Sequence, residues 1–310
     1  MYFHYQQIML GLHLAILILT TPLLAGIISV LLLGRSRRNT DIPPGIVIHS
    51  VINHARSGFT YYNSARFRQL IARLDELRYT ACTLKAGISN CREQIQHGRM
   101  PFILTFDDGF ANFFEQALPV LQEYDFKATI FPIADFLGTR EAWDIFSPLE
   151  HLSVTHVREI ARLGFEIGSH TATHACLPFL SDRDAIEELR KSKNTLEDTI
   201  GAEVVSLSFP YGCWSLRIWQ LAQDLGYRYA TSYRSHHTTS TGIVAVHGVY
   251  SLDTPEDVVL KITKARTISN SLARSHIIPH FAKGSTIWRF RAAYAVERSL
   301  LQCSHKSKPR

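Results

Sequence analysis

Residues 102–133 read FILTFDDGFANFFEQALPVLQEYDFKATIFPI, and this stretch decides the fold. The apolar run 102–106 predicts a strand that stops at Asp107-Asp108-Gly109. Residues 111–124 predict a helix, and residues 128–133 predict a second strand. A strand, a helix and a strand in this order predict a βα unit in a parallel sheet.

The same alternation continues on both sides of this unit. The helix predicted at 181–200 has the clearest limits, because Ser181 can cap its start, with Asp184 three residues later, and Gly201 can end it. About seven βα units suit a barrel better than an open sheet, and barrel chemistry lies on the loops at the carboxyl ends of the strands. The remaining predicted strands are 45–51, 165–169, 204–209, 227–233 and 243–249, and the remaining helices are 62–79, 154–163 and 216–225.

The bulk composition predicts a globular chain. It has 310 residues, of which 46% are hydrophobic and 19% are charged, so the chain can bury a sizeable core. The five cysteines are odd in number and form no CxxC pair. Their spacing therefore indicates neither a zinc-thiolate site nor a disulfide framework.

The start of the chain predicts a membrane helix. Residues 8–33 are apolar, and no Lys, Arg, Asp or Glu precedes Arg35, so the run exceeds the roughly 20 residues that cross a bilayer. A basic region ahead of a shorter apolar core would indicate a cleavable signal, and neither is present. We therefore expect a retained transmembrane helix at 1–34 and a linker at 35–44; a buried helix is the alternative. Because Arg35, Arg37 and Arg38 follow the apolar run, the positive-inside rule favours a single-pass protein whose domain is cytoplasmic.

The end of the chain is strongly basic. Residues 261–310 carry 11 Lys/Arg and one acidic residue, whereas residues 35–260 carry 22 Lys/Arg and 26 Asp/Glu. We expect 261–310 to form a basic, helical C-terminal tail that meets an anionic membrane surface. For residues 286–301, an amphipathic helix packed on the domain is the alternative. No groove-reading motif accompanies it, so nucleic acid is not expected as a partner, and no protein partner is predicted.

Two short motifs carry the chemistry. Asp107 and Asp108 end a predicted strand, and Gly109 permits a sharp turn, so one carboxylate can bind a metal while the other faces a water molecule. A solvated Asp-Gly turn is the alternative. The sequence SHTATH, residues 169–174, follows another predicted strand and places His170 and His174 four residues apart. Two imidazoles and a carboxylate make a three-ligand site with open positions, which is typical of a catalytic metal.

These motifs resemble those of the polysaccharide deacetylase (NodB-homology) family. TFDDG at 105–109 followed by SHTATH at 169–174 carries the resemblance. IHSV at 48–51 is similar to the "YHSV" element of one branch of the family, and FPYG at 209–212 is similar to the "YPYG" third motif of that branch. The resemblance covers about residues 45–250, two thirds of the chain.

The resemblance implies a fold, an activity and a set of roles. The fold is α/β, a distorted (β/α) barrel of about seven parallel strands, here over residues 45–260. The activity is hydrolysis of N-acetyl groups on an aminosugar, with zinc or a similar divalent ion such as cobalt or nickel. The motifs place Asp107 as the base, Asp108, His170 and His174 as metal ligands, and Pro210 and Tyr211 along the substrate groove, with the Tyr211 N–H near the oxyanion.

Three further histidines are candidates for the site. His49 ends the predicted first strand, so it can face the mouth of the barrel and contact substrate. The late Leu-x-His motif that supplies a general acid in the family is not evident. His247 and His280 are the candidates to replace it.

The third motif also departs from the family. Ser208 and Phe209 stand where an Arg that steadies the catalytic Asp is common. A glycan- or metal-binding domain with weak catalysis is therefore one alternative. An esterase or deformylase acting on a lipid-linked sugar is another, because the predicted membrane helix and basic tail favour a substrate at the bilayer. The expected partners are thus an acetylated aminosugar glycan or a lipid-linked sugar, and a membrane.

Overall fold

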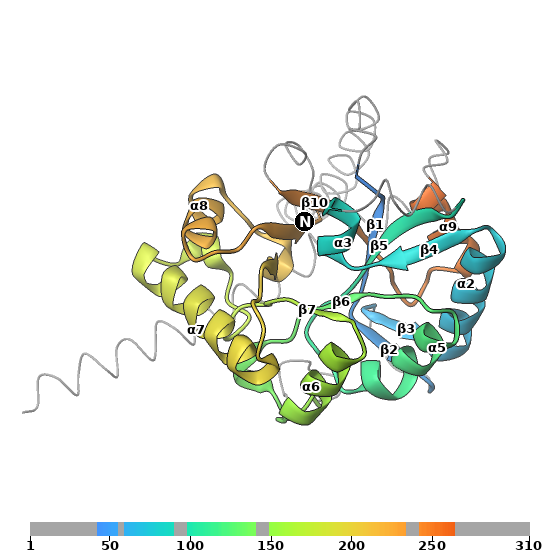
Figure 1. The fold of residues 1–310 in the computed structure, drawn as a ribbon, viewed down its shortest axis with the longest axis horizontal. Helices are drawn as coiled ribbons and strands as arrows, with labels where there is room; N and C mark the ends of the chain where they lie inside the picture. Colours follow the sequence, from blue (N-terminus) through green and yellow to red (C-terminus); the bar gives the residue numbers. More distant parts are fainter. Residues whose placement is uncertain (1–41, 55–58, 90–97, 141–148, 234–241, 264–310) are drawn as a thin grey trace, which may run out of the picture.

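The computed structural model describes residues 42–54, 59–89, 98–140, 149–233 and 242–263, and they form a parallel barrel (Figure 1). Neighbouring strands are hydrogen-bonded in the order β7-β6-β5-β1-β10-β9-β8, and β4 pairs with the first half of β5. The strands are β1 (Gly45–Ile48), β4 (Tyr79–Cys82), β5 (Met100–Phe106), β6 (Thr129–Ile130), β7 (Glu166–Ile167), β8 (Ser206–Ser208), β9 (Tyr229–Ser232) and β10 (Ile243–Gly248).

The two end strands of this order nearly close the barrel. The Ser169 N–H donates to the Ser206 carbonyl at 2.8 Å, and the Ser208 N–H donates to the Ser169 carbonyl at 2.9 Å. A parallel bridge joins Ser169 to Leu207, although no continuous ladder forms there. The expected (β/α) barrel of about seven parallel strands is therefore confirmed.

Helices surround the strands (Figure 1). Ser181 caps α7 by accepting from the Asp184 N–H, and Gly201 ends it at φ +68°, as the sequence predicted. The short helix α3 instead packs against the inner side chains of the barrel, where Leu84 shares a cluster with Ile103 and Val244. The helices are α2 (Ser64–Glu76), α3 (Leu84–Ser89), α5 (Leu118–Glu123), α6 (Val154–Arg162), α7 (Asp182–Ile200), α8 (Leu216–Asp224) and α9 (Pro255–Thr263).

Several short elements differ from the expectation. The helix predicted at 62–79 is shorter, because Asn63 caps α2 through the Ala65 and Arg66 N–H groups. The helix predicted at 111–124 begins as a π-helical turn, η1 (Phe113–Ala117), before α5. The strand predicted at 45–51 is interrupted at His49 and gives β1 and β2 (Ser50–Ile52). Strand β3 (Tyr61–Asn63), strand β4 and helix α3 had no counterpart in the prediction.

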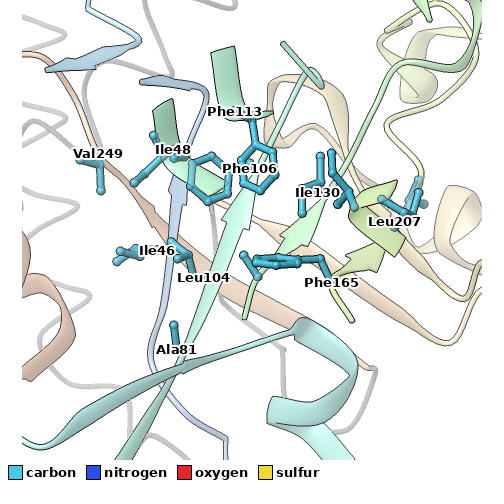
Figure 2. Close-up of a cluster of buried hydrophobic side chains, with 14 of the residues drawn as sticks. Ile46, Ile48, Ala81, Leu104, Phe106, Phe113, Ile130, Phe165, Leu207 and Val249 are labelled. Atoms are coloured by element: carbon cyan, nitrogen blue, oxygen red, sulfur yellow. The ribbon is translucent and has the colours of Figure 1, made fainter. Parts of the chain in front are cut away.

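Alternation along the strands decides which side chains reach the site. Ile46 and Ile48 of β1 and Leu104 and Phe106 of β5 belong to the large cluster of buried apolar side chains shown in part in Figure 2. Ile103 belongs to the separate inner cluster. Successive side chains on a strand point to opposite faces. Asp107 lies four residues after Ile103, an even number, so it also faces the barrel interior. His49 lies one residue after Ile48, so it faces the side opposite to Ile48, which is again the interior.

The predicted ends of the chain lie almost entirely outside the described residues. This applies to the membrane helix at 1–34, to nearly all of the linker 35–44, and to the tail beyond Thr263. Among the residues that the structure describes, none of the helices is long and apolar enough to cross a membrane. Helix α9 continues to Thr263 and buries Lys261 and Ile262, so the first residues assigned to the basic tail belong to this helix.

Candidate metal and catalytic site

The loops at the carboxyl ends of β5, β7 and β8 contain unusual backbone conformations. Asp108, Thr171, His174 and Tyr211 all have φ between +59° and +68°. Within the described ranges, Arg78 and Asp125 are the other non-glycine residues with positive φ. A side chain in this region costs of order 1–3 kcal/mol, and such strain concentrates where function requires a fixed geometry. The strained residues thus mark one site at the mouth of the barrel.

Asp108, His170 and His174 converge at this site. The Asp108 Oδ1 atom lies 3.3 Å from His170 Nε2 and 3.4 Å from His174 Nε2. One ligand atom from each residue lies within 4.8 Å of the others, and all three residues are buried. The sequence-predicted ligands are therefore brought together, although two of them come from a loop more than 60 residues further along the chain.

The donor set fits a divalent cation. Asp108 Oδ1 is buried and makes no hydrogen bond, although two imidazole nitrogens face it. A buried carboxylate oxygen left in this way is costly unless a cation satisfies it. Two imidazoles and one carboxylate are the ligands of catalytic zinc sites that keep open positions.

Hydrogen bonds at Nδ1, the ring nitrogen that faces away from Asp108, orient both imidazoles. His170 Nδ1 lies 2.9 Å from the Ser208 carbonyl oxygen, and His174 Nδ1 lies 3.0 Å from the Tyr211 hydroxyl. A carbonyl can only accept, so His170 Nδ1 carries the hydrogen and donates it, and the Nε2 atom faces Asp108. Such contacts on the second nitrogen orient metal-binding histidines and raise their basicity.

Burial and neighbouring charges shift the pKa values of four ionisable groups at the site in different directions. Burial raises the pKa of Asp107, against the opposing effect of His170 and His49. Burial also acts to raise the pKa of Asp108, but the facing imidazoles outweigh it and hold that pKa below its ordinary value. Burial and the neighbouring His170 lower the pKa of His174 to about 3. Asp108 is therefore ionised and His174 neutral near neutral pH, which are the forms that bind a metal.

His170 differs from its partner. Burial lowers its pKa, but Asp107 and Asp108 outweigh burial and hold the pKa above its ordinary value. A cation bound at this position would take over the role of that proton. Metal binding would then release the proton, so metal affinity should depend on pH.

One carboxylate oxygen of Asp107 accepts a hydrogen bond and the other does not. The Ser208 hydroxyl donates to Asp107 Oδ2 at 2.9 Å. Asp107 Oδ1 is buried and makes no hydrogen bond. A buried carboxylate beside a metal site, with one lone-pair oxygen open, has the form of a general base.

His49 lies on the wall formed by β1. Its Nε2 atom is 3.1 Å from the Tyr233 hydroxyl, and its buried Nδ1 atom makes no hydrogen bond. It is near enough to Asp107 and Asp108 to lower the pKa of both carboxyls. The structure thus places His49 at the site, as the sequence suggested.

His247 is not placed to act as a general acid. On β10 it is in register with Ile46, and paired residues of parallel strands share a face. Ile46 belongs to the large cluster, which lies on the outer side of the strands, and so do Ile243 and Val249, which lie an even number of residues from His247. The candidate therefore points away from the barrel interior, because period-two alternation places it on the wrong face. The second candidate, His280, lies outside the described residues.

The Pro-Tyr turn borders the metal ligands. Pro210 is buried in the 3-10 turn η4 (Pro210–Gly212), and Tyr211 lies at φ +59° within it. The Tyr211 and His174 ring centroids are 4.5 Å apart. Both residues expected along the groove are thus at the site, and Tyr211 makes a contact with the ring of His174 that no sequence motif indicated.

Sequence reasoning missed one supporting histidine. His151 Nδ1 lies 3.0 Å from the backbone carbonyl of Asp108, and its ring packs between Phe110 and Phe136 with centroids 4.9 and 5.6 Å away. It stabilises the left-handed turn at Asp108. No motif surrounds His151, so no signal in the single sequence could have found it.

Comparisons with known proteins find similarity to polysaccharide deacetylases. Residues 95–230 match the family model of polysaccharide deacetylases. The Bacillus subtilis protein YxkH, named for the polysaccharide deacetylases, is 29% identical over 148 residues, which cover 47% of this chain and 50% of that protein. Chitin deacetylase 1 of Cryptococcus neoformans var. grubii is 28% identical over 160 residues, covering 51% of this chain and 30% of that protein.

A solved structure shows the same fold. A polysaccharide deacetylase from Bacillus cereus superposes with a TM-score of 0.57 at 24% identity, over 71% of this chain and 68% of that chain. The chain spans half or less of the length of the two curated relatives.

Proposed function

We propose that this chain, whose residues 95–230 belong to the polysaccharide deacetylase family, hydrolyses N-acetyl groups on an acetylated aminosugar glycan. The observation that carries the proposal is the convergence of Asp108, His170 and His174 beside Asp107, which has one open oxygen. The two curated relatives are named for deacetylation of polysaccharides and of chitin. These names suggest the substrate class for this chain.

A divalent metal, with zinc as the first choice, would be held by Asp108, His170 and His174. When bound, such an ion polarises a carbonyl group and makes a water molecule more acidic. The first ligand is held at the β5 turn, and the Ser208 carbonyl and Tyr211 hydroxyl hold the two imidazoles. The protein thus supplies a preformed site with positions left for water and substrate.

Different groups of the protein then act at different points of the reaction. Asp107 Oδ1 accepts a proton from the attacking water while the water oxygen forms a bond to the acetyl carbon. The Tyr211 N–H, in the turn beside His174, stabilises the negative charge that develops on the acetyl oxygen. As the carbon–nitrogen bond breaks, the leaving nitrogen takes a proton, and acetate and a free amine result.

We assign the proton donor for the amine to His49. It lies on the wall contributed by β1, whereas both histidine ligands follow β7. The Tyr233 hydroxyl holds its Nε2, which leaves the Nδ1 atom for the substrate. In its protonated form this imidazole donates to the amine, as a general acid positioned by hydrogen bonding.

The test is acetate release by the full-length chain. The metal-free protein should release no acetate from N-acetylglucosamine oligomers, and added zinc, cobalt or nickel should restore release. Asp107→Asn should lower kcat by a factor of 10² or more, a typical magnitude for loss of a general base, while the metal stays bound. Asp135→Asn, whose carboxylate pairs with Lys191 on α7, provides a matched control.

The same assay separates the alternatives. Binding of metal and glycan without turnover would replace hydrolysis with a binding role. Faster release from O-acetylated or lipid-linked sugars than from N-acetylglucosamine oligomers would reassign the substrate. An Asp107→Asn variant as active as the parent would reject the proposed mechanism.

A further inference from the structure

Ser208 makes three hydrogen bonds that meet at the candidate site. Its N–H donates to the Ser169 carbonyl at 2.9 Å, one residue before His170. Its carbonyl accepts from His170 Nδ1 at 2.9 Å, and its hydroxyl donates to Asp107 Oδ2 at 2.9 Å. The residue is 2% exposed, so water does not compete for these contacts. One residue on β8 therefore contacts both a metal ligand and the base.

The backbone and the side chain of Ser208 act on different partners. The two backbone bonds fix the seam of the barrel and the orientation of His170. The side-chain bond reaches only the carboxylate of Asp107. Substituting the side chain should therefore leave the metal ligand in place, which makes the two roles separable by experiment.

The two oxygens of Asp107 have unequal surroundings. Oδ2 accepts the Ser208 hydroxyl, whereas Oδ1 makes no hydrogen bond. A carboxylate anchored at one oxygen loses the freedom to rotate about its last torsion. Its remaining lone pairs then keep one direction, which is what a proton acceptor in a fixed reaction geometry requires.

We propose that Ser208 is a positioning residue, whose hydroxyl holds Asp107 Oδ2 and thereby fixes Oδ1 as the oxygen that takes the proton. This inference rests on the proposed function, because it assigns a partner to the proposed base. Ser208 itself does not contact the reacting atoms.

A matched control lies two residues earlier on the same strand. Ser206 faces the same side of β8 as Ser208 and is also buried. Its hydroxyl donates to Glu166 Oε1, not to a residue of the site. Ser206→Ala thus removes a buried serine hydroxyl from β8 without touching Asp107.

The kinetic test compares the full-length parent with Ser208→Ala, Ser208→Thr and Ser206→Ala. We expect Ser208→Ala to bind one metal ion as tightly as the parent and to keep KM within about twofold, with kcat lower by roughly 10- to 100-fold, the usual effect of losing such a supporting contact. Ser208→Thr keeps a hydroxyl and should recover most of kcat, and Ser206→Ala should keep kcat near the parent value.

Three results would overturn the inference. The first is an unchanged kcat in Ser208→Ala. The second is a loss of kcat in Ser206→Ala that equals the loss in Ser208→Ala. The third is a failure of Ser208→Thr to recover kcat although the variant folds and binds metal.

A crystal structure of Ser208→Ala provides a readout that does not depend on activity. We expect the Asp107 carboxylate to be rotated or to occupy two orientations, while His170 stays in place. A carboxylate unchanged from the parent would overturn the inference. If instead the parent releases no acetate from any substrate, the proposed function has failed, and the crystallographic result still decides whether Ser208 orients Asp107.

Discussion

The Tyr211 hydroxyl lies 3.0 Å from Nδ1 of His174, and both residues have a left-handed backbone. The contact joins the Pro-Tyr turn after β8 to the histidine loop after β7. A metal held by His174 Nε2 would leave the hydrogen on Nδ1, which then donates to the Tyr211 oxygen. The two strained loops therefore hold each other, and the Pro-Tyr turn and the candidate metal site are coupled through one side chain.

Removing this hydroxyl should weaken metal binding. We expect Tyr211→Phe to lower zinc affinity roughly 10- to 100-fold, because His174 loses the acceptor that orients its ring. Titration against a competing chelator measures the change. Tyr229→Phe is the control: its hydroxyl lies 3.2 Å from Ser89 Oγ, beside α3, and zinc affinity should stay at the parent value. Equal affinities of Tyr211→Phe and the parent would contradict the coupling.

The turn after Asp108 has room only for glycine. Gly109 has φ +68°, and a Cβ atom there would lie 2.6 Å from Pro132 Cα. Gly201 has the same φ, but a Cβ atom there would meet nothing within 4 Å. Gly201→Ala should therefore cost only the conformational penalty, about 1–2 kcal/mol. Gly109→Ala should cost roughly 3–5 kcal/mol, because overpacking against backbone is added.

Urea unfolding of the two glycine variants checks this difference. Metal content should also fall in Gly109→Ala, since the turn positions Asp108, and should be unchanged in Gly201→Ala. Equal losses of unfolding free energy would show that the contact with Pro132 does not decide the identity of residue 109.

The sequence was sufficient where a local pattern carried the information. The apolar run before Asp107 predicted β5, and Ser181 and Gly201 predicted the limits of α7, because strands and capped helices depend on nearby residues. The convergence of Asp108, His170 and His174 was predicted because both motifs follow strands, and parallel strands end at one face of a barrel.

Long-range relationships were beyond the sequence. In the sequence, Ser208 was notable only because an Arg is common near this position in the family. Its hydroxyl lies beside Asp107 only because the barrel closes between β7 and β8. His247 looked like a catalytic histidine because its strand was predicted without its register. Once β10 pairs with β1, Ile46 and His247 share the outer face. Register and closure depend on contacts between distant residues, and a single sequence does not specify them locally.

His49 and His247 make a matched pair for the proton donor. We expect His49→Gln to lower kcat by 10² or more with little change in KM, because the leaving amine loses its acid while the substrate is still bound. His247→Gln should keep kcat near the parent value, since this side chain lies on the outer face. Steady-state acetate release by both variants measures the difference. A greater loss of kcat in His247→Gln would reverse the assignment.

The buried ion pair of Lys261 and Asp253 makes the barrel sensitive to the loss of a single charge. Both side chains are 0% exposed, and Lys261 Nζ also donates to the Gly248 carbonyl at 2.7 Å, where β10 ends. Lys261→Met leaves Asp253 buried without its cation and should cost roughly 3–5 kcal/mol of unfolding free energy. Removing both charges, in Lys261→Met with Asp253→Asn, should recover part of that loss, because no buried charge then stays unpaired.

The control for this pair is an ion pair on the surface. Lys191 pairs with Asp135, and its side chain is 49% exposed, so Lys191→Met should cost less than about 1 kcal/mol. Urea unfolding of the four proteins, including the parent, orders their stabilities. A double variant less stable than Lys261→Met alone would mean that the Asp253 carboxylate stabilises the turn without the lysine, through the Tyr250 N–H that donates to it at 2.9 Å.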